Sequence, residues 1–269
     1  MKMSNTESSD ARQKPMDESH AKTAKFAWKS LYRVGGVAAL IAAGLEIAAA
    51  LIGIISSSSS GPSPSTVIGL FTLLQHNRFL GLVDLGLFDI AALALLIPMF
   101  LAVCIALRRA SASFMAIAMI LSLVGIAVYL ATETAFSMLA LSNQYAAATT
   151  DAQRSLFEAT GQAMLAEQVG AGTGTYMAFV LIGVAGLIIA TVMLRSNIFG
   201  KVTAAVGILA NAITLAYYIG LPFVSMRPSL LIYSASGLVY LIWIILVGLR
   251  LLQLAQGGSR DVAKQPAVS

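Results

Sequence analysis

Six apolar stretches, separated by short polar or charged segments, make up most of the chain. Each is longer than the roughly 20 residues with which a helix crosses a hydrocarbon core. The pattern therefore predicts an all-α, polytopic membrane protein with six transmembrane helices. They are expected at residues 33–56, 79–107, 112–142, 172–194, 199–222 and 229–255.

Two segments between the predicted spans are long enough to form structure of their own. In the first, the apolar run from Val67 to Leu74 is too short to span and is expected to form a helix at the outer interface. In the second, Thr150 followed by Gln153 has the spacing of a capping box. An amphipathic helix is therefore predicted in the outer loop between the third and fourth spans.

The composition excludes an ordinary soluble protein. Of the 269 residues, 58% are hydrophobic and 11% are charged, against roughly 45 to 50% and 25% in soluble domains. The mean hydropathy is +0.84. We expect three parts: a disordered cytoplasmic tail (1–30), a six-helix transmembrane domain (31–256) and a disordered C-terminal tail (257–269).

The positions of the basic residues predict the orientation. Fourteen of the seventeen Lys and Arg lie in the two terminal segments and in the turns that share a side with them. By the positive-inside rule, both termini are expected in the cytoplasm. The formal net charge of +5 is thus a topological signal. No basic motif interleaved with aromatic residues is present, so no nucleic-acid partner is expected.

Four of the twelve acidic residues lie within the predicted spans, at Glu46, Asp84, Asp89 and Glu133. A charged side chain near the bilayer centre costs about 2.5 kcal/mol or more, and no Lys lies deep in a span to pair with them. The helical rise puts all four between the midplane and the outer face. Glu46 lies on a stripe of small residues that lets another helix approach, so we expect it to face the bundle interior. The stripe consists of Ala39, Ala42, Ala43, Ala49, Ala50 and Gly53.

These acids predict an outward-facing polar cavity. The candidate ligand-binding residues are Glu46, Asp89, Glu133, Tyr129, Asn211 and Tyr218. An acidic cavity without a compensating cation suits a small cationic or lipidic ligand, an amine or a proton. In the alternative interpretation, each acid is protonated and holds two helices together by hydrogen bonds.

Two other functions remain open at this level. The chain could be a structural or accessory subunit that assembles with itself or with another membrane protein through its Ala/Gly stripes. It could also be an intramembrane hydrolase that uses paired acids, which requires two carboxyl groups within about 3 Å of each other.

The scarcity of histidine and cysteine excludes most metal sites and most nucleophilic catalysis. The two histidines are His20, in the N-terminal tail, and His76, in an outer loop, and the one cysteine, Cys104, lies in an apolar run. We therefore expect no metal site, no catalytic triad and no cofactor. The leading hypothesis is a non-enzymatic protein that binds a ligand within the lipid bilayer.

Two short runs carry a family resemblance. The first is Asn77 to Asp84 (Asn-Arg-Phe-Leu-Gly-Leu-Val-Asp), continuing to Asp89, and the second is Leu194 to Gly200, followed by Gly207 and Tyr217-Tyr218. Over about residues 30–255 the chain resembles a bacterial multi-pass membrane family catalogued as domain of unknown function 4386. It departs from that family at Gly200, where a proline is expected, at Glu133 and in the long polar tail. The resemblance implies the bacterial cytoplasmic membrane and the same topology, but no activity.

Overall fold

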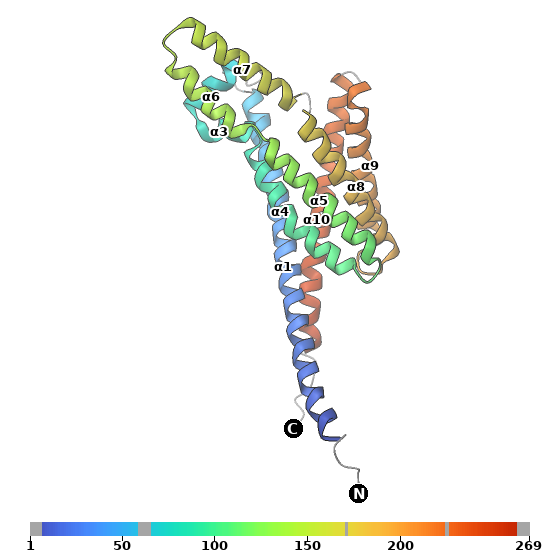
Figure 1. The fold of residues 1–269 in the computed structure, drawn as a ribbon. Helices are drawn as coiled ribbons and strands as arrows, with labels where there is room; N and C mark the ends of the chain where they lie inside the picture. Colours follow the sequence, from blue (N-terminus) through green and yellow to red (C-terminus); the bar gives the residue numbers. More distant parts are fainter. Residues whose placement is uncertain (1–6, 59–65, 170–171, 224–225, 263–269) are drawn as a thin grey trace.

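The computed structural model describes residues 7–58, 66–169, 172–223 and 226–262. Every regular element in these ranges is a helix (Figure 1). The elements are α1 (Glu7–Ser58), α2 (Val67–His76), α3 (Arg78–Asp84), α4 (Leu87–Leu107), α5 (Ala112–Thr132), α6 (Ala135–Ala147), α7 (Asp151–Val169), α8 (Thr173–Arg195), α9 (Lys201–Gly220), the 3-10 turn η1 (Leu221–Phe223) and α10 (Met226–Val262).

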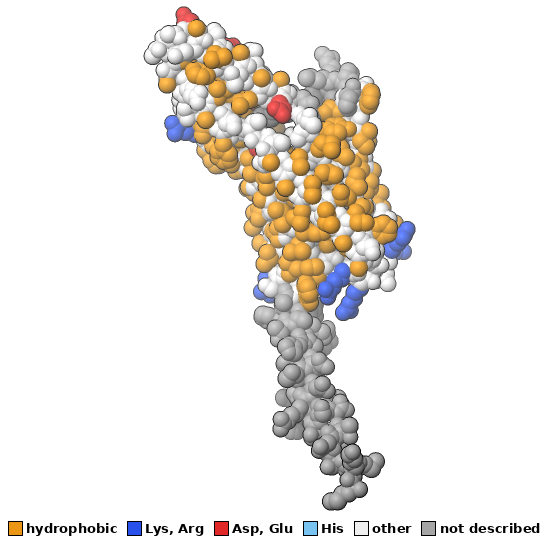
Figure 2. Space-filling view, in the orientation of Figure 1, with side chains coloured by type: hydrophobic (Ala, Val, Ile, Leu, Met, Phe, Trp, Pro, Cys, Tyr) orange, Lys and Arg blue, Asp and Glu red, His pale blue; other side chains and the backbone are white. Residues whose placement is uncertain are grey.

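Six helical segments are long and apolar enough to cross a membrane, as the sequence predicts. In the space-filling view, hydrophobic side chains cover the middle of the molecule, and Lys and Arg gather at the lower edge of this band (Figure 2). The N-terminal part of α1 and the C-terminal part of α10 lie beyond that same edge (Figure 1). The six segments are Trp28–Ile55, Leu87–Leu107, Ala112–Ala147, Thr173–Arg195, Lys201–Gly220 and Ser234–Gln256.

The spanning helices form a closed ring. Going round it, α1 packs against α4, α4 against α5, α5 against α8, α8 against α9, α9 against α10, and α10 again against α1. The first and last spans are therefore neighbours, although they lie far apart in the sequence. A ring of this kind can enclose space wherever adjacent helices separate.

Small residues bring the helices together at several points of the ring. A Cβ placed on Gly35 of α1 would lie 2.6 Å from the Cβ of Ala102 on α4, and one on Gly125 of α5 would lie 2.8 Å from the Ala178 carbonyl oxygen on α8. Contacts this short leave no room for a side chain. The glycines thus act within the ring, where close backbone approach provides dispersion contacts that lipid cannot replace.

The structure divides two of the predicted spans into two helices each. The span predicted at 79–107 breaks at Leu85 and Gly86, where Gly86 has a φ of 95°. The span predicted at 112–142 breaks at Glu133, whose ψ of 133° is extended. An extended or left-handed residue ends the intrahelical hydrogen bonding. The outer parts of these stretches, α3 and α6, pack in a cap on the bundle. Asp84 lies before the apolar segment Leu87–Leu107, whereas α6 remains part of the apolar segment Ala112–Ala147.

The cap consists mainly of α2, α3, α6 and α7 at the end of the bundle away from the termini (Figure 1). Its apolar core includes Leu70, Phe71 and Met138. The helix predicted at Val67 to Leu74 is present as α2, and the helix predicted between the third and fourth spans is present as α7. Half of the predicted capping box forms, because the Gln153 N–H donates to Thr150 Oγ1 over 3.3 Å, while Gln153 Oε1 accepts from the Thr149 N–H rather than from that of Thr150.

The helices at the two ends of the chain are longer than the sequence predicts. Helix α1 already begins at Glu7, within the segment predicted as a disordered tail, and α10 continues to Val262. The last residues of the predicted C-terminal tail, 263–269, lie outside the described part of the chain.

The glycine contacts of α1 can be tested by adding one methyl group. Gly35→Ala is expected to lower the thermal stability in mild detergent, because the new Cβ would lie 2.6 Å from Ala102 Cβ and 2.8 Å from the Pro98 carbonyl oxygen. Overpacking of this kind typically costs about 1 to 3 kcal/mol. Gly44→Ala is the matched control on the same helix, because no atom lies within 4 Å of its Cβ position. Equal melting temperatures for the two variants would contradict the packing of α1 on α4.

Candidate functional site

A cavity of about 610 Å³ lies inside the ring, between α1, α4, α8, α9 and α10. Its lining comes from the half of each helix that lies far from the chain termini, such as Glu46 to Ile54 on α1 and Ala92 to Leu96 on α4. Most of the lining is apolar. The volume is in the range of roughly 300 to 1,000 Å³ that is common for small-molecule sites.

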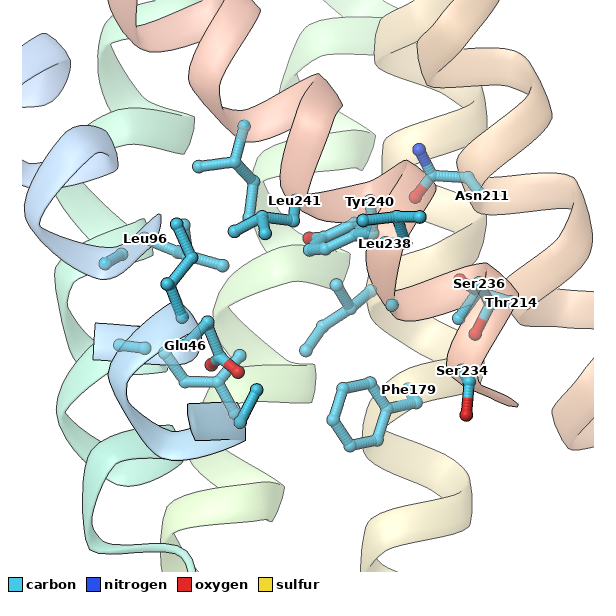
Figure 3. Close-up of a pocket in the computed structure, with 18 of the residues that line it drawn as sticks. Glu46, Leu96, Phe179, Asn211, Thr214, Ser234, Ser236, Leu238, Tyr240 and Leu241 are labelled. Atoms are coloured by element: carbon cyan, nitrogen blue, oxygen red, sulfur yellow. The ribbon is translucent and has the colours of Figure 1, made fainter. Parts of the chain in front are cut away.

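A few polar side chains line this cavity from three helices (Figure 3). Glu46 of α1 points toward the space in front of Phe179, and no described residue forms a hydrogen bond or an ion pair with its carboxyl group. The Tyr240 hydroxyl of α10 lies close enough to Glu46 to interact with it electrostatically. The other polar lining residues are Asn211, Thr214, Ser234 and Ser236.

Two buried polar atoms of the lining have no hydrogen-bond partner among the described residues, namely the Tyr240 hydroxyl and Asn211 Oδ1. The Asn211 amide is fixed in place, since Nδ2 donates to the Gly207 carbonyl oxygen over 2.8 Å and the absence of a side chain at Gly186 makes room for it. Buried polar groups are nearly always hydrogen-bonded in native proteins, so each exception requires an explanation. Both atoms belong to residues that line the cavity, although the atoms themselves are covered by neighbouring groups.

Aromatic rings form one wall of the cavity. Phe179 of α8 and Tyr218 of α9 are stacked, with ring centroids 4.9 Å apart and an angle of 7° between the planes. Behind them, Tyr129 of α5 meets Phe179 edge to face at 5.6 Å. The stacked pair gives the cavity a rigid apolar surface with π electrons, which attracts cations as well as apolar groups.

The other predicted site residues form a separate cluster next to the cavity. A Cβ placed on Gly86 would lie 3.4 Å from Asp89 Oδ2, 3.7 Å from the Tyr129 hydroxyl and 3.9 Å from Glu133 Oε1. The two breaks in the outer parts of the ring therefore meet at this point. Asp89 also interacts electrostatically with Glu133 and with Glu46, so the acids form a row that leads toward the cavity.

The local structure explains why two of these acids lie at the breaks. Asp89 is in the first turn of α4, where a negative charge is favoured by the unpaired N–H groups at a helix N-terminus. Glu133 ends α5, and its Oε1 accepts a hydrogen bond from the Thr134 N–H, one residue before α6, over 3.0 Å. The presence of an acid at each of these two positions is thus explained by the helix ends and requires no ligand.

The structure separates the six predicted site residues into two groups. Glu46, Asn211 and Tyr218 line the cavity, whereas Asp89, Glu133 and Tyr129 do not. Phe179 and Tyr240 also line the cavity and are not among the residues predicted from the sequence. Ser236 and Tyr240 are four residues apart and therefore lie on one face of the same helix. This polar spacing is visible in the sequence, but a search for acidic residues alone does not detect it.

In the described part of the chain, no group of three or more His, Cys, Asp and Glu residues is placed to hold a metal ion. Cys104, the free cysteine, is buried in the core.

Comparison with known proteins finds no matching family model, curated protein or solved structure.

The unpartnered Tyr240 hydroxyl leads to a stability prediction for the unliganded protein. Tyr240→Phe is expected to leave the melting temperature in detergent unchanged or to raise it, because no hydrogen bond to a described residue is lost. An unsatisfied buried polar group costs about 1 to 3 kcal/mol. The comparison variant is Ser142→Ala, which removes a buried hydroxyl that accepts from Gln75 Nε2 at 3.0 Å and is expected to lower the melting temperature. If Tyr240→Phe lowers the melting temperature as much as Ser142→Ala does, the Tyr240 hydroxyl must have a hydrogen-bond partner and the prediction is wrong.

Proposed function

We propose that this multi-pass protein binds a small, largely apolar molecule with a cationic amine in the cavity between α1, α4, α8, α9 and α10. The observation that carries the proposal is the Glu46 carboxyl group in an otherwise apolar cavity, with two buried acceptors, the Tyr240 hydroxyl oxygen and Asn211 Oδ1, on residues of the same lining. None of the three has a hydrogen-bond partner among the described residues.

An ammonium group suits such a set of acceptors. It carries donors and no acceptor, and it neutralises a carboxylate that would otherwise be costly to keep ionised in the membrane. The stacked rings of Phe179 and Tyr218 add an attractive surface for a cation. A neutral molecule would leave the Glu46 carboxylate without a counter-charge.

The proposed location is the cytoplasmic membrane of a bacterium, with both termini in the cytoplasm. The orientation rests on the positive-inside bias of fourteen among seventeen basic residues. The bacterial source rests on the resemblance described above. In this orientation the cavity belongs to the outer half of the bundle, because its lining residues on α1 come after the midpoint of the first span.

The other hypotheses from the sequence have less support. The subunit hypothesis uses the Ala/Gly stripes, but the first half of the stripe on α1, at Ala39, Ala42 and Ala43, is buried within the same chain. The hydrolase hypothesis uses paired acids, and the acids that lie together, Asp89 and Glu133, do not line the cavity. The proposal therefore includes no hydrolytic step.

Removal of the carboxylate tests the proposal directly. Glu46→Gln is expected to weaken the binding of butylamine or phenethylamine to the purified protein by about 100-fold, because a buried charge-assisted contact is worth roughly 2 to 5 kcal/mol. Equilibrium binding of the radiolabelled amines in mild detergent measures this. Tyr240→Phe is expected to weaken binding less, by about tenfold, because it removes one neutral acceptor.

Glu158→Gln is the matched control. It makes the same change in charge on α7 of the cap, where Glu158 does not line the cavity, and it should bind the amines as the wild type does. If neither amine binds to the wild type, or if Glu46→Gln and Glu158→Gln bind equally well, the proposal is wrong.

A further inference from the structure

Helices α1 and α10 touch at one end of the ring and separate toward the other (Figure 1). Near the end that carries the termini, a Cβ on Gly36 would lie 2.9 Å from the Gly248 carbonyl oxygen, and one on Gly248 would lie 3.1 Å from Ala39 Cβ. Toward the other end, no atom lies within 4 Å of the Cβ positions of Gly53 and Gly237. The two helices thus form a wedge that is closed at Gly36 and Gly248.

The open part of this wedge is an edge of the cavity. Glu46, Leu51 and Ile54 of α1 line it on one side, and Gly237 and Leu238 of α10 line it on the other. About 12 Å of α1 lies between Glu46 and Ile54. The cavity therefore continues from the carboxyl group along the separation between the two helices.

Most of the residues along this opening are apolar and exposed on the side of the bundle, and Ser234, which is also exposed, is polar. Leu51, Ile54 and Leu238 are 55%, 63% and 60% exposed, although all three line the cavity. They lie in or next to the apolar segments that face lipid in a membrane protein. An aqueous entrance would be expected to carry polar or charged side chains, whereas this one matches the acyl chains of a bilayer.

From this geometry we propose that the ligand enters sideways from the outer leaflet, between α1 and α10, and that it is a single-chain aliphatic amine. This inference rests on the proposed amine-binding function and specifies its ligand. The ammonium group pairs with the Glu46 carboxylate, and the hydrocarbon chain passes between Leu51 and Leu238 into the lipid. Part of the chain remains in the bilayer, so the cavity need not enclose the whole molecule.

The access route is tested by narrowing the opening. In Gly237→Phe a bulky side chain is placed at the rim, where no atom lies within 4 Å of the Cβ position. The protein is reconstituted in phosphatidylcholine nanodiscs and mixed with vesicles that contain radiolabelled dodecylamine. The protein is captured at timed intervals, and the radioactivity bound to it is counted. The variant is expected to take up dodecylamine about ten times more slowly than the wild type, because the rate depends on passage through a constricted entrance.

Gly44→Phe is the control for this change. Gly44 is also an exposed glycine with no atom within 4 Å of its Cβ position, but it does not line the cavity. Its uptake rate should equal that of the wild type. Leu51→Trp narrows the opposite rim and should slow uptake as Gly237→Phe does, which provides a second test if Gly237→Phe does not fold.

The outcomes separate this inference from the proposed function. If butylamine binds in a Glu46-dependent way but dodecylamine does not, the single-chain ligand is wrong. If dodecylamine binds and both rim variants take it up at the wild-type rate, the lateral route is wrong and the amine site stands. If neither amine binds to the wild type, the proposed function fails and this inference fails with it.

Discussion

The backbone contact between α1 and α10 at Gly36 and Gly248 is the constraint on which the rest of the architecture depends. It closes the ring of six helices by joining the first span to the last. Two straight helices that touch at one level and cross at an angle must separate at other levels. The space between their far ends is bounded behind by α4, α8 and α9, and it becomes the cavity. The site is thus a consequence of how the ring closes.

The sequence predicts the spans well because an apolar run of sufficient length has few alternatives in a membrane protein. It predicts the position of Glu46 only in part. The small-residue stripe on α1 is tightly packed in its first half, where Ala39, Ala42 and Ala43 are at most 1% exposed. In its second half, Ala50 is exposed and lines the cavity. A stripe indicates that a helix can be approached closely, but the level at which this happens depends on the crossing angle.

The breaks in the second and third spans could not be predicted from hydropathy, because the apolar character continues through them. Gly86 and Glu133 interrupt the helices by their backbone conformations, and the two positions support each other across the bundle through Asp89 and Tyr129. That contact is between residues more than forty positions apart. The sequence alone does not show this contact, so Asp89 and Glu133 cannot be distinguished from other acidic residues within a span.

The acids of the outer half therefore do not form one functional set. Asp89 is in the first turn of a helix, and Glu133 accepts a hydrogen bond from the N–H just before the next helix, so helix termini account for both. Glu46 lies within a continuous helix, away from any terminus, and no described group forms a hydrogen bond or an ion pair with it. An acid at such a position is costly for the fold. The proposed amine ligand would offset this cost, since its cationic group would pair with a carboxylate that the surrounding helices leave without a partner.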